Sequence, residues 1–286
     1  MKPAPFDYVA ARSVDHAVEL LGSDADAKII AGGQSLLPVL NMRLAAPILV
    51  VDIGRVDELA TIRIDDEGSL VVGAAITQTD ALADRSVADG WPMLHTAITN
   101  IGHPQIRNRG TVCGSFAHAD PAAELPAVAL ALDASFLVRS ASGERTIPAG
   151  DMFVGPFMTA LEPEDLLVAA AFPMKAADTG WAFREFATRP GDFATVGVAV
   201  RLTTSDGVAA DPRVAVFGVG GAATRLPTVE QALVGTANPA IDADVGTALN
   251  GAIDPVDDVH ASADTRLELT RRLLIDAVAE AWRRCS

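Results

Sequence analysis

The hydrophobic pattern of the first fifty or so residues predicts a small α/β unit. Ser13–Leu21 carries apolar residues at helical spacing, and its serine stands in the N-cap position. Lys28–Ala31 and Ile48–Asp52 are short apolar runs rich in β-branched residues, which is typical of buried strands. We therefore expect one helix and two strands around a loop that begins with two adjacent glycines.

The next segments predict a second, larger unit. The acidic run Asp65-Asp66-Glu67 and Gly68 lie between two short apolar segments, which indicates a β-hairpin. The expected strands are Thr61–Ile64, Ser69–Val72, Ser135–Arg139 and Leu166–Phe172, and the expected helices are Thr77–Ala83, Met93–Ile98 and Pro121–Leu132. Pro126 is compatible with the last helix only in its first turn.

A change of composition at Met174–Thr179 predicts a boundary, after which the pattern becomes that of a meander. The expected strands are Trp181–Ala187, Ala194–Thr203 and Val214–Val219. Thr265–Trp282 has an apolar face, with Asp264 as the candidate cap. This long helix should cover the second sheet.

Two glycine-containing segments carry the candidate chemistry. Asn100–Pro126 (NIGHPQIRNRGTVCGSFAHADPAAELP) is expected to be a polar loop that runs into a helix, and Ile29–Pro38 reads IIAGGQSLLP. The ligand groups of the first segment are the backbone at Gly110 and Gly114, the hydroxyls of Thr111 and Ser115, and the charges of Arg107 and Arg109. For either segment alone, a surface turn or a strand-to-loop transition is the preferred interpretation, but together they indicate one long ligand with a phosphate or pyrophosphate.

Composition excludes several classes of function. Half of the 286 residues are hydrophobic, so the chain can bury a substantial core, and the net charge of −15 argues against nucleic acid or anionic membranes as partners. The two cysteines, Cys113 and Cys285, form no CxxC motif, and the five histidines show no ligand spacing, so no metal site is expected. With neither an apolar leader nor a run of roughly 20 apolar residues, the expected location is the cytoplasm.

Other apparent motifs are weak. Gly218–Ala223 (GVGGAA) fits a loose dinucleotide fingerprint, but Pro227 follows too soon for the long helix that such a loop must open, so a strand end is the preferred interpretation. Ser35 and Ser115 stand in no G-x-S-x-G context, which argues against covalent catalysis.

Three ordered segments resemble the FAD-binding medium subunit of molybdenum hydroxylases, the family of the carbon monoxide, nicotine and xanthine dehydrogenases. They are AGGQSLLPVLNMRLAAP (31–47), IRNRGTVCGSFAHADPAAELP (106–126) and FREFATRPGDFATVGVAV (183–200). The resemblance implies an α+β fold, with a two-part FAD-binding domain over residues 1–175 followed by a smaller α/β C-terminal domain over 176–286. The two FAD-binding parts would span about 1–57 and 58–175.

The resemblance also implies which residues bind the cofactor. The pyrophosphate would lie between Ala31, Gly32, Gly33, Gln34 and Ser35 on one side and Thr111, Gly114 and Ser115 on the other. Ile101, Gly102, His118 and Asp120 would line the cofactor, Glu124 would bond the ribityl or flavin region, and Leu167, Arg184 and Asp192 would lie near the flavin ring. Cys113 replaces a glycine common in the family, and would be strained if that position needs a positive φ; as a cysteine, it is expected to be a small buried apolar residue.

By the same resemblance, the chain would pass electrons from [2Fe–2S] clusters through FAD to an external acceptor. Its partners would be a molybdopterin-binding large subunit and a [2Fe–2S] small subunit in a heterohexamer. Two alternatives stay open. One is a non-catalytic nucleotide-binding or assembly subunit with the same fold. The other is a self-sufficient flavoenzyme of the vanillyl-alcohol-oxidase type, which would need a substrate domain over the flavin, and the residues that follow the FAD-binding domain are few for one.

Overall fold

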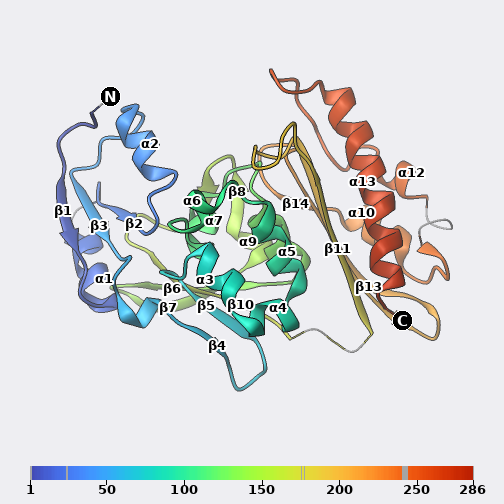
Figure 1. Cartoon of the computed structure of the whole chain (residues 1–286), viewed down its shortest axis with the longest axis horizontal. Helices are drawn as coiled ribbons and strands as arrows, with labels where there is room; N and C mark the ends of the chain where they lie inside the picture. The colour runs from blue at the N-terminus through green and yellow to red at the C-terminus, as the bar shows by residue number, and fades with distance from the viewer. Residues whose placement is uncertain (1, 24, 175, 177, 240–243, 286) are drawn as a thin grey trace.

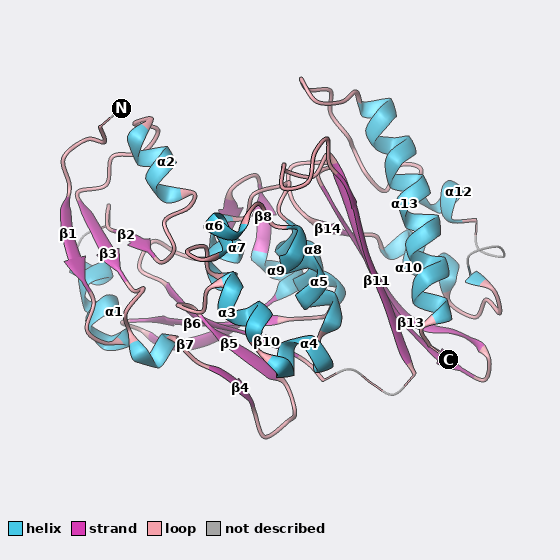
Figure 2. Cartoon of the chain, viewed as in Figure 1, coloured by secondary structure: helices cyan, strands magenta, loops and turns pink. Residues whose placement is uncertain are grey.

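The structure is a computed structural model that describes residues 2–23, 25–174, 176, 178–239 and 244–285. It contains a three-stranded, a five-stranded and a four-stranded sheet in chain order, with a two-stranded hairpin beside the second (Figure 1). Figure 2 shows helices packed around each sheet, and the mixture of helix and sheet confirms the α+β prediction. Residues 175 and 177 of the predicted boundary segment lie outside the described residues.

The first sheet is parallel and small. Its strands are β1 (Asp7–Ala10), β2 (Lys28–Ile30) and β3 (Leu49–Asp52), with β3 in the centre. The predicted helix is α1 (Val14–Ser23), and Ser13 caps it by accepting a hydrogen bond from the His16 N–H at 3.1 Å. A short helix, α2 (Leu36–Asn41), follows the paired glycines.

The second sheet is antiparallel, in the order β4-β5-β10-β6-β7. Its strands are β4 (Ile62–Ile64), β5 (Leu70–Gly73), β6 (Ser135–Ser140), β7 (Gly143–Pro148) and β10 (Leu166–Phe172). The predicted hairpin is confirmed, with Gly68 in its turn at a φ of +84°. Around the sheet lie η1 (Asp57–Leu59), α3 (Gln78–Ala83), α4 (Arg85–Gly90), α5 (Pro92–Asn100), α9 (Ala149–Met152) and the hairpin of β8 (Phe153–Gly155) and β9 (Met158–Thr159). Phe116, Phe136 and Phe172 meet at the centre of this core.

The expected loop Asn100–Pro126 is wrong, because most of it is helical. It forms α6 (Pro104–Arg107), α7 (Val112–His118) and the start of α8 (Glu124–Ala131), and α8 is the helix that was expected at Pro121–Leu132. Of its three glycines, only Gly102 has a positive φ, at +45°. Pro126 is the third residue of α8, so it lies in the first turn, where proline is tolerated.

The third sheet is an antiparallel meander. Its strands are β11 (Thr179–Phe186), β12 (Val196–Ser205), β13 (Val208–Phe217) and β14 (Thr224–Arg225), paired in that order. The helices are α10 (Pro227–Leu233), α12 (Val245–Leu249) and the long α13 (Ala263–Arg283), which packs against β11 and β12. The predicted cap of α13 is wrong: Ser262, not Asp264, accepts the hydrogen bond from the Thr265 N–H. The segment Gly218–Ala223 is the connection from β13 to β14, as expected for a strand end.

Helix α8 lies between the two larger sheets. All eight of its residues are buried, and it contacts α5 on one side and β12, β13 and β14 on the other. Figure 2, in which α8 is labelled, shows it between the central helices and the C-terminal sheet. A helix that is apolar all round needs cover on every face, and this one receives it within a single hydrophobic core that also includes Ala199, Ala215 and Phe217 of the C-terminal sheet.

Candidate cofactor site

The two glycine segments are in direct backbone contact. A Cβ atom built on Gly32 would lie 2.0 Å from the carbonyl oxygen of Arg109 and 2.7 Å from the Cα of Gly110. No side chain fits at this distance, so Gly32 is required for the contact itself. Gly33 supplies a positive φ of +73°, which turns the chain into α2. The tertiary fold thus joins two segments that lie more than seventy residues apart in the sequence.

Short helices begin on both sides of this contact. Ser35 is the N-cap residue of α2 and makes no side-chain cap hydrogen bond. At the start of α2 the Leu37 N–H donates to the Gly33 carbonyl oxygen at 3.1 Å and Pro38 has no N–H, so the Leu36 N–H is the donor that this helix can offer an anion. The side chains nearby are donors too: the Gln34 amide, which lies 3.4 Å from the Gly32 carbonyl oxygen, and the Ser35 hydroxyl.

The other side is built on Thr111. Its hydroxyl oxygen caps α7 by accepting a hydrogen bond from the Gly114 N–H at 3.0 Å. A Cβ atom on Gly114 would lie 2.7 Å from that oxygen, so the glycine is needed for the cap rather than for a positive φ. Gly110 is fixed by the Gln78 N–H, which donates to its carbonyl at 2.8 Å. The N-terminal end of α7 is therefore rigidly placed beside the Gly32–Gly33 turn.

Arg107 does not supply the charge expected of it at the ligand. Its guanidinium donates to the backbone carbonyls of Ile101 and Gly102, at 2.7 and 3.1 Å. It therefore fixes the turn between α5 and α6. The loop that contains Asp192 packs against the same turn, since a Cβ atom on Gly191 would lie 2.4 Å from the imidazole of His103. The structure thus brings Ile101, Gly102 and the Asp192 loop together.

Cys113 is not strained, and it does not face the proposed ligand. It lies inside α7, is 2% exposed, and its thiol is 3.5 Å from the Val72 carbonyl oxygen in the core of the second unit. Burial raises the pKa of this thiol to about 12. The interpretation as a small buried apolar residue is confirmed.

The connection between α7 and α8 gathers titratable side chains. Asp120 accepts a hydrogen bond from the Ala122 N–H at 2.9 Å, and the His118 ring lies 5.1 Å from the ring of Phe157. Burial lowers the pKa of His118, although the nearby charge of Asp120 acts in the opposite direction. Glu124 is only 5% exposed, and burial raises its pKa to about 8, with smaller contributions from Glu185 and Asp120.

Glu185 is the site residue that the sequence analysis missed. It follows Arg184 on β11, and successive strand residues point to opposite faces of a sheet. Arg184 forms an ion pair with Glu280 on α13 at 2.8 Å, so its guanidinium is directed away from Glu124. Glu185 is on the other face: one of its carboxylate oxygens is buried without a hydrogen-bond partner, and burial raises its pKa to about 7. The alternation of the strand was the signal that could have identified it.

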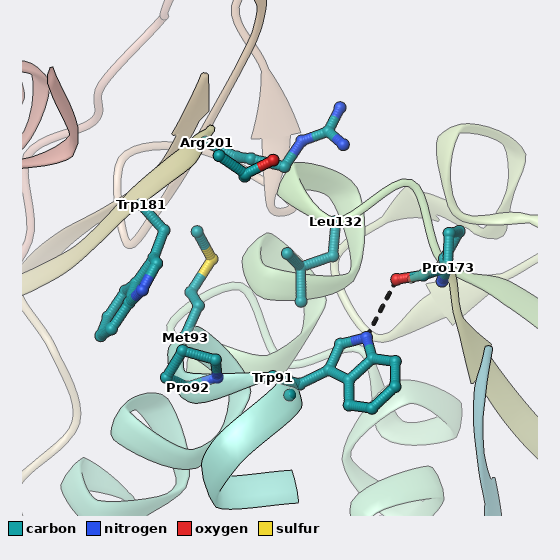
Figure 3. A pocket seen from close by; sticks show the side chains of 9 residues that line it. Trp91, Pro92, Met93, Leu132, Pro173, Trp181 and Arg201 are labelled. Atoms are coloured by element: carbon teal, nitrogen blue, oxygen red, sulfur yellow. Dashed lines mark hydrogen bonds between the residues drawn. The ribbon is translucent and has the colours of Figure 1, made fainter. Parts of the chain in front are cut away.

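Leu167 is also separated from the cluster of motifs. It lies on β10 beside a register shift, is 6% exposed and packs in the core of the first two units. An apolar pocket between the C-terminal sheet and the central helices is lined by Trp91, Met93, Leu132, Trp181 and Arg201, among others (Figure 3). None of its lining residues belongs to the glycine segments or the carboxylate group, so it is not part of this site.

The groups that meet here suit a pyrophosphate joined to a polar organic molecule. Backbone N–H groups, one amide and three hydroxyls, those of Ser35, Thr111 and Ser115, are donors appropriate to phosphate oxygens. The buried, partnerless oxygen of Glu185 and the buried Glu124 are acceptors or, when protonated, donors for the rest of the ligand. Within the described residues, no group of three or more His, Cys, Asp or Glu side chains could hold a metal ion. Across that same part of the chain, every helix is too short or too polar to span a bilayer.

Comparison with known proteins identifies the ligand. Residues 4–175 match the family described as the FAD binding domain in molybdopterin dehydrogenase, and residues 181–281 match the CO dehydrogenase flavoprotein C-terminal domain. The chain is 40% identical to the nicotine 6-hydroxylase medium subunit of Paenarthrobacter nicotinovorans, over 99% of this chain and 100% of that protein. It is 42% identical to subunit alpha of the 6-hydroxypseudooxynicotine dehydrogenase complex from the same organism, over 99% and 97%.

A solved structure agrees with these matches. The carbon monoxide dehydrogenase of Hydrogenophaga pseudoflava, in a form that lacks the Mo-pyranopterin moiety, contains a chain that superimposes with a TM-score of 0.95 at 36% identity, with complete coverage of both chains. The protein therefore belongs to the FAD-binding medium subunits of the molybdenum hydroxylases, the flavoprotein subunits of multi-subunit oxidoreductases.

Proposed function

We propose that this chain is the electron relay between the [2Fe–2S] clusters of a small subunit and an external acceptor. A molybdopterin-binding large subunit would carry out the substrate chemistry, and the three subunits would form a heterohexamer. The backbone contact between Gly32 and Arg109–Gly110 carries the proposal, because it turns two separate glycine segments into one cradle. The names of the relatives, which are subunits of hydroxylase and dehydrogenase complexes, support it.

The proposed division of the chain is an FAD-binding domain at 1–175, with parts at about 1–57 and 58–175, and a C-terminal domain at 176–286. The proposed FAD contacts are Ala31, Gly32, Gly33, Gln34, Ser35, Ile101, Gly102, Thr111, Gly114, Ser115, His118, Asp120, Glu124, Leu167, Arg184 and Asp192. The side chain of Arg184 is engaged by Glu280, so a contact from this position would come from its backbone. The cytoplasmic location stays a prediction.

Each part of the site has its own role. FAD, when bound, exchanges electrons one or two at a time with its partners. The N-terminal end of α2 and the hydroxyls around α7 would hold the pyrophosphate. Glu124 has a pKa of about 8, so at neutral pH it carries a proton and can donate an O–H hydrogen bond to the ribityl or flavin part. Glu185 would face the same region from the C-terminal sheet.

The residues of this site do not select the substrate, and they leave the class of the external acceptor open, whether quinone, NAD, oxygen or a carrier protein. No catalytic acid or base is assigned to the chain, and the pocket that selects a substrate would lie on the large subunit. The isolated chain should therefore bind FAD but should not oxidise a reduced organic substrate. Such activity would instead support the self-sufficient flavoenzyme.

Purification of the isolated chain tests the proposal. The expected preparation is yellow and releases about one FAD per chain on denaturation, measured by absorbance and chromatography. A chain that neither retains nor rebinds FAD would favour the non-catalytic assembly subunit. Co-purification of the native complex, with iron and molybdenum analysis, tests the partners. In that complex, reduction of the flavin by substrate should require the iron–sulfur subunit.

A further inference from the structure

A single carboxylate just after the C-terminal end of α8 forms ion pairs with three arginines of the C-terminal sheet. Asp133 follows α8 in a left-handed conformation with a φ of +51°. Its oxygens lie 3.0 Å from Arg201 Nη2, 2.9 Å from Arg213 Nε and 3.3 Å from Arg225 Nη1. These are ion pairs between segments 68 to 92 residues apart in the sequence.

The three arginines form a row across the sheet. Arg201 on β12 is directly opposite Arg213 on β13, and Arg225 on β14 is opposite Ala215, two residues further along β13. Like charges on neighbouring strands repel, so this row requires anions. Two come from the C-terminal sheet and its helix: Asp211 pairs with Arg201 and Arg213, and Glu230 pairs with Arg225 at 2.6 Å. Asp133 is the third, and it is the only one of the three that belongs to the other side of the interface.

Apolar packing beside this cluster is incomplete. Leu132 and Arg201 line the pocket described above, in which Met93 lies beside Trp181 across the interface, while the Trp91 indole N–H donates to the Pro173 carbonyl oxygen at 3.0 Å (Figure 3). Across a void, the distance between the central helices and the C-terminal sheet is less restricted than it would be across a close-packed core. The charged cluster therefore fixes the C-terminal sheet along α8 at this end together with the apolar contacts of α8 on β12 and β13.

We propose that Asp133 is a positioning residue for the cofactor site. Helix α8 begins at Glu124 and ends about 10 Å further on, beside Asp133, at a rise of 1.5 Å per residue. The sheet that holds Arg201, Arg213 and Arg225 also carries Glu185 on β11. By anchoring the sheet to one end of α8, Asp133 sets the distance between Glu185 and Glu124 at the other end. This inference rests on the proposed function, in which both carboxylates face the ribityl or flavin part of FAD.

The test compares Asp133→Asn with Asp211→Asn in the full chain. Both aspartates have a positive φ, of +51° and +41°, which asparagine tolerates, and both pair with Arg201 and Arg213. Only Asp133 crosses the interface. The measurements are FAD affinity by equilibrium dialysis and the visible circular dichroism of bound FAD, which reports its orientation.

We expect Asp133→Asn to weaken FAD binding about tenfold and to change the visible spectrum, while Asp211→Asn stays within about twofold of the wild type. Equal effects of the two variants on affinity and spectrum would overturn the inference. If Asp133→Asn does not fold, Arg213→Gln removes a partner from the sheet side and should give the same spectral change; an unaltered spectrum would then count against a positioning role.

Absence of FAD from the wild-type chain would refute the proposed function but would still leave the anchor testable. In that case urea unfolding of the apo chain is followed by tryptophan fluorescence, since Trp91 lies on one side of the interface, and Trp181 and Trp282 on the other. Asp133→Asn should unfold in two separate transitions, one for each side of the interface, whereas Asp211→Asn should unfold in one. A single shared transition in both variants would overturn the anchor as well.

Discussion

Replacing Glu124 by glutamine should stabilise the apo protein, and the gain should depend on pH. Glu124 is 5% exposed, and burial raises its pKa from 4.5 to about 8. Below pH 4.5 the carboxyl is protonated in both the folded and the unfolded chain, so its titration does not reduce stability. As the pH rises, the unfolded chain loses this proton first, and folding is disfavoured progressively until the folded pKa is passed.

The expected size follows from the separation of the two pKa values. Each pKa unit corresponds to about 1.4 kcal/mol, so the cost of folding with this carboxyl is about 3 kcal/mol at pH 7 and levels off at roughly 4 to 5 kcal/mol above pH 8. Glutamine has a similar shape and no titration. The difference in unfolding free energy between Glu124→Gln and the wild type should therefore grow by about 3 kcal/mol from pH 4.5 to pH 7.

Urea unfolding of the apo proteins at pH 4.5, 7 and 8.5 measures this difference. Glu67→Gln is the matched control, since Glu67 is exposed in the turn of the β4–β5 hairpin, and its curve should follow the wild type at each pH. FAD affinity supplies a second readout: it should fall above pH 8 in the wild type, where Glu124 loses its donor proton, and stay level in Glu124→Gln. A stability difference that does not change with pH would refute the reasoning from burial.

Three further substitutions or measurements test the remaining parts of the site. Gly32→Ala should abolish FAD binding and cost about 1 to 3 kcal/mol, because its Cβ would lie 2.0 Å from a backbone oxygen; Gly22→Ala, with open space around it, should retain FAD binding and stability in the same assays. Gly114→Ala should displace the Thr111 cap of α7 and cost about 1 kcal/mol in thermal or urea unfolding, and an unchanged midpoint would contradict the role given to the cap. Cys113 should react with a thiol reagent only as fast as the chain unfolds, since its thiol is buried with a pKa of about 12; rapid labelling of the native protein would show that it is accessible.

The strands and the longer helices could be predicted from the sequence because their residues follow the periodicity of one buried face. The β4–β5 hairpin and β10 are examples, as are α1 and most of α13. The cap of α13 was assigned to Asp264 rather than Ser262, an error of two residues. Both are capping residues, and only the hydrogen bond to the Thr265 N–H distinguishes them.

The segment Asn100–Pro126 was misread for a different reason. Its helices α6 and α7 have four and seven residues and contain proline or glycine, so no periodic pattern develops over their length. They are stabilised by contacts from elsewhere, such as the Gln78 N–H on the Gly110 carbonyl. Arg107 was likewise expected to bring its positive charge to the ligand, because the two carbonyl groups that it binds come together only in the folded turn.

The sequence by itself determined the fold class and, through its three family motifs, the cofactor, because the glycines and hydroxyl residues of those motifs are recognisable within short stretches of the chain. Only the tertiary structure placed Gly32 against Arg109, directed Glu185 rather than Arg184 toward Glu124, and joined Asp133 to three arginines. These arrangements depend on strand register and on the packing of α8 between two sheets. Both are set by contacts between residues distant in the sequence, which no local pattern encodes.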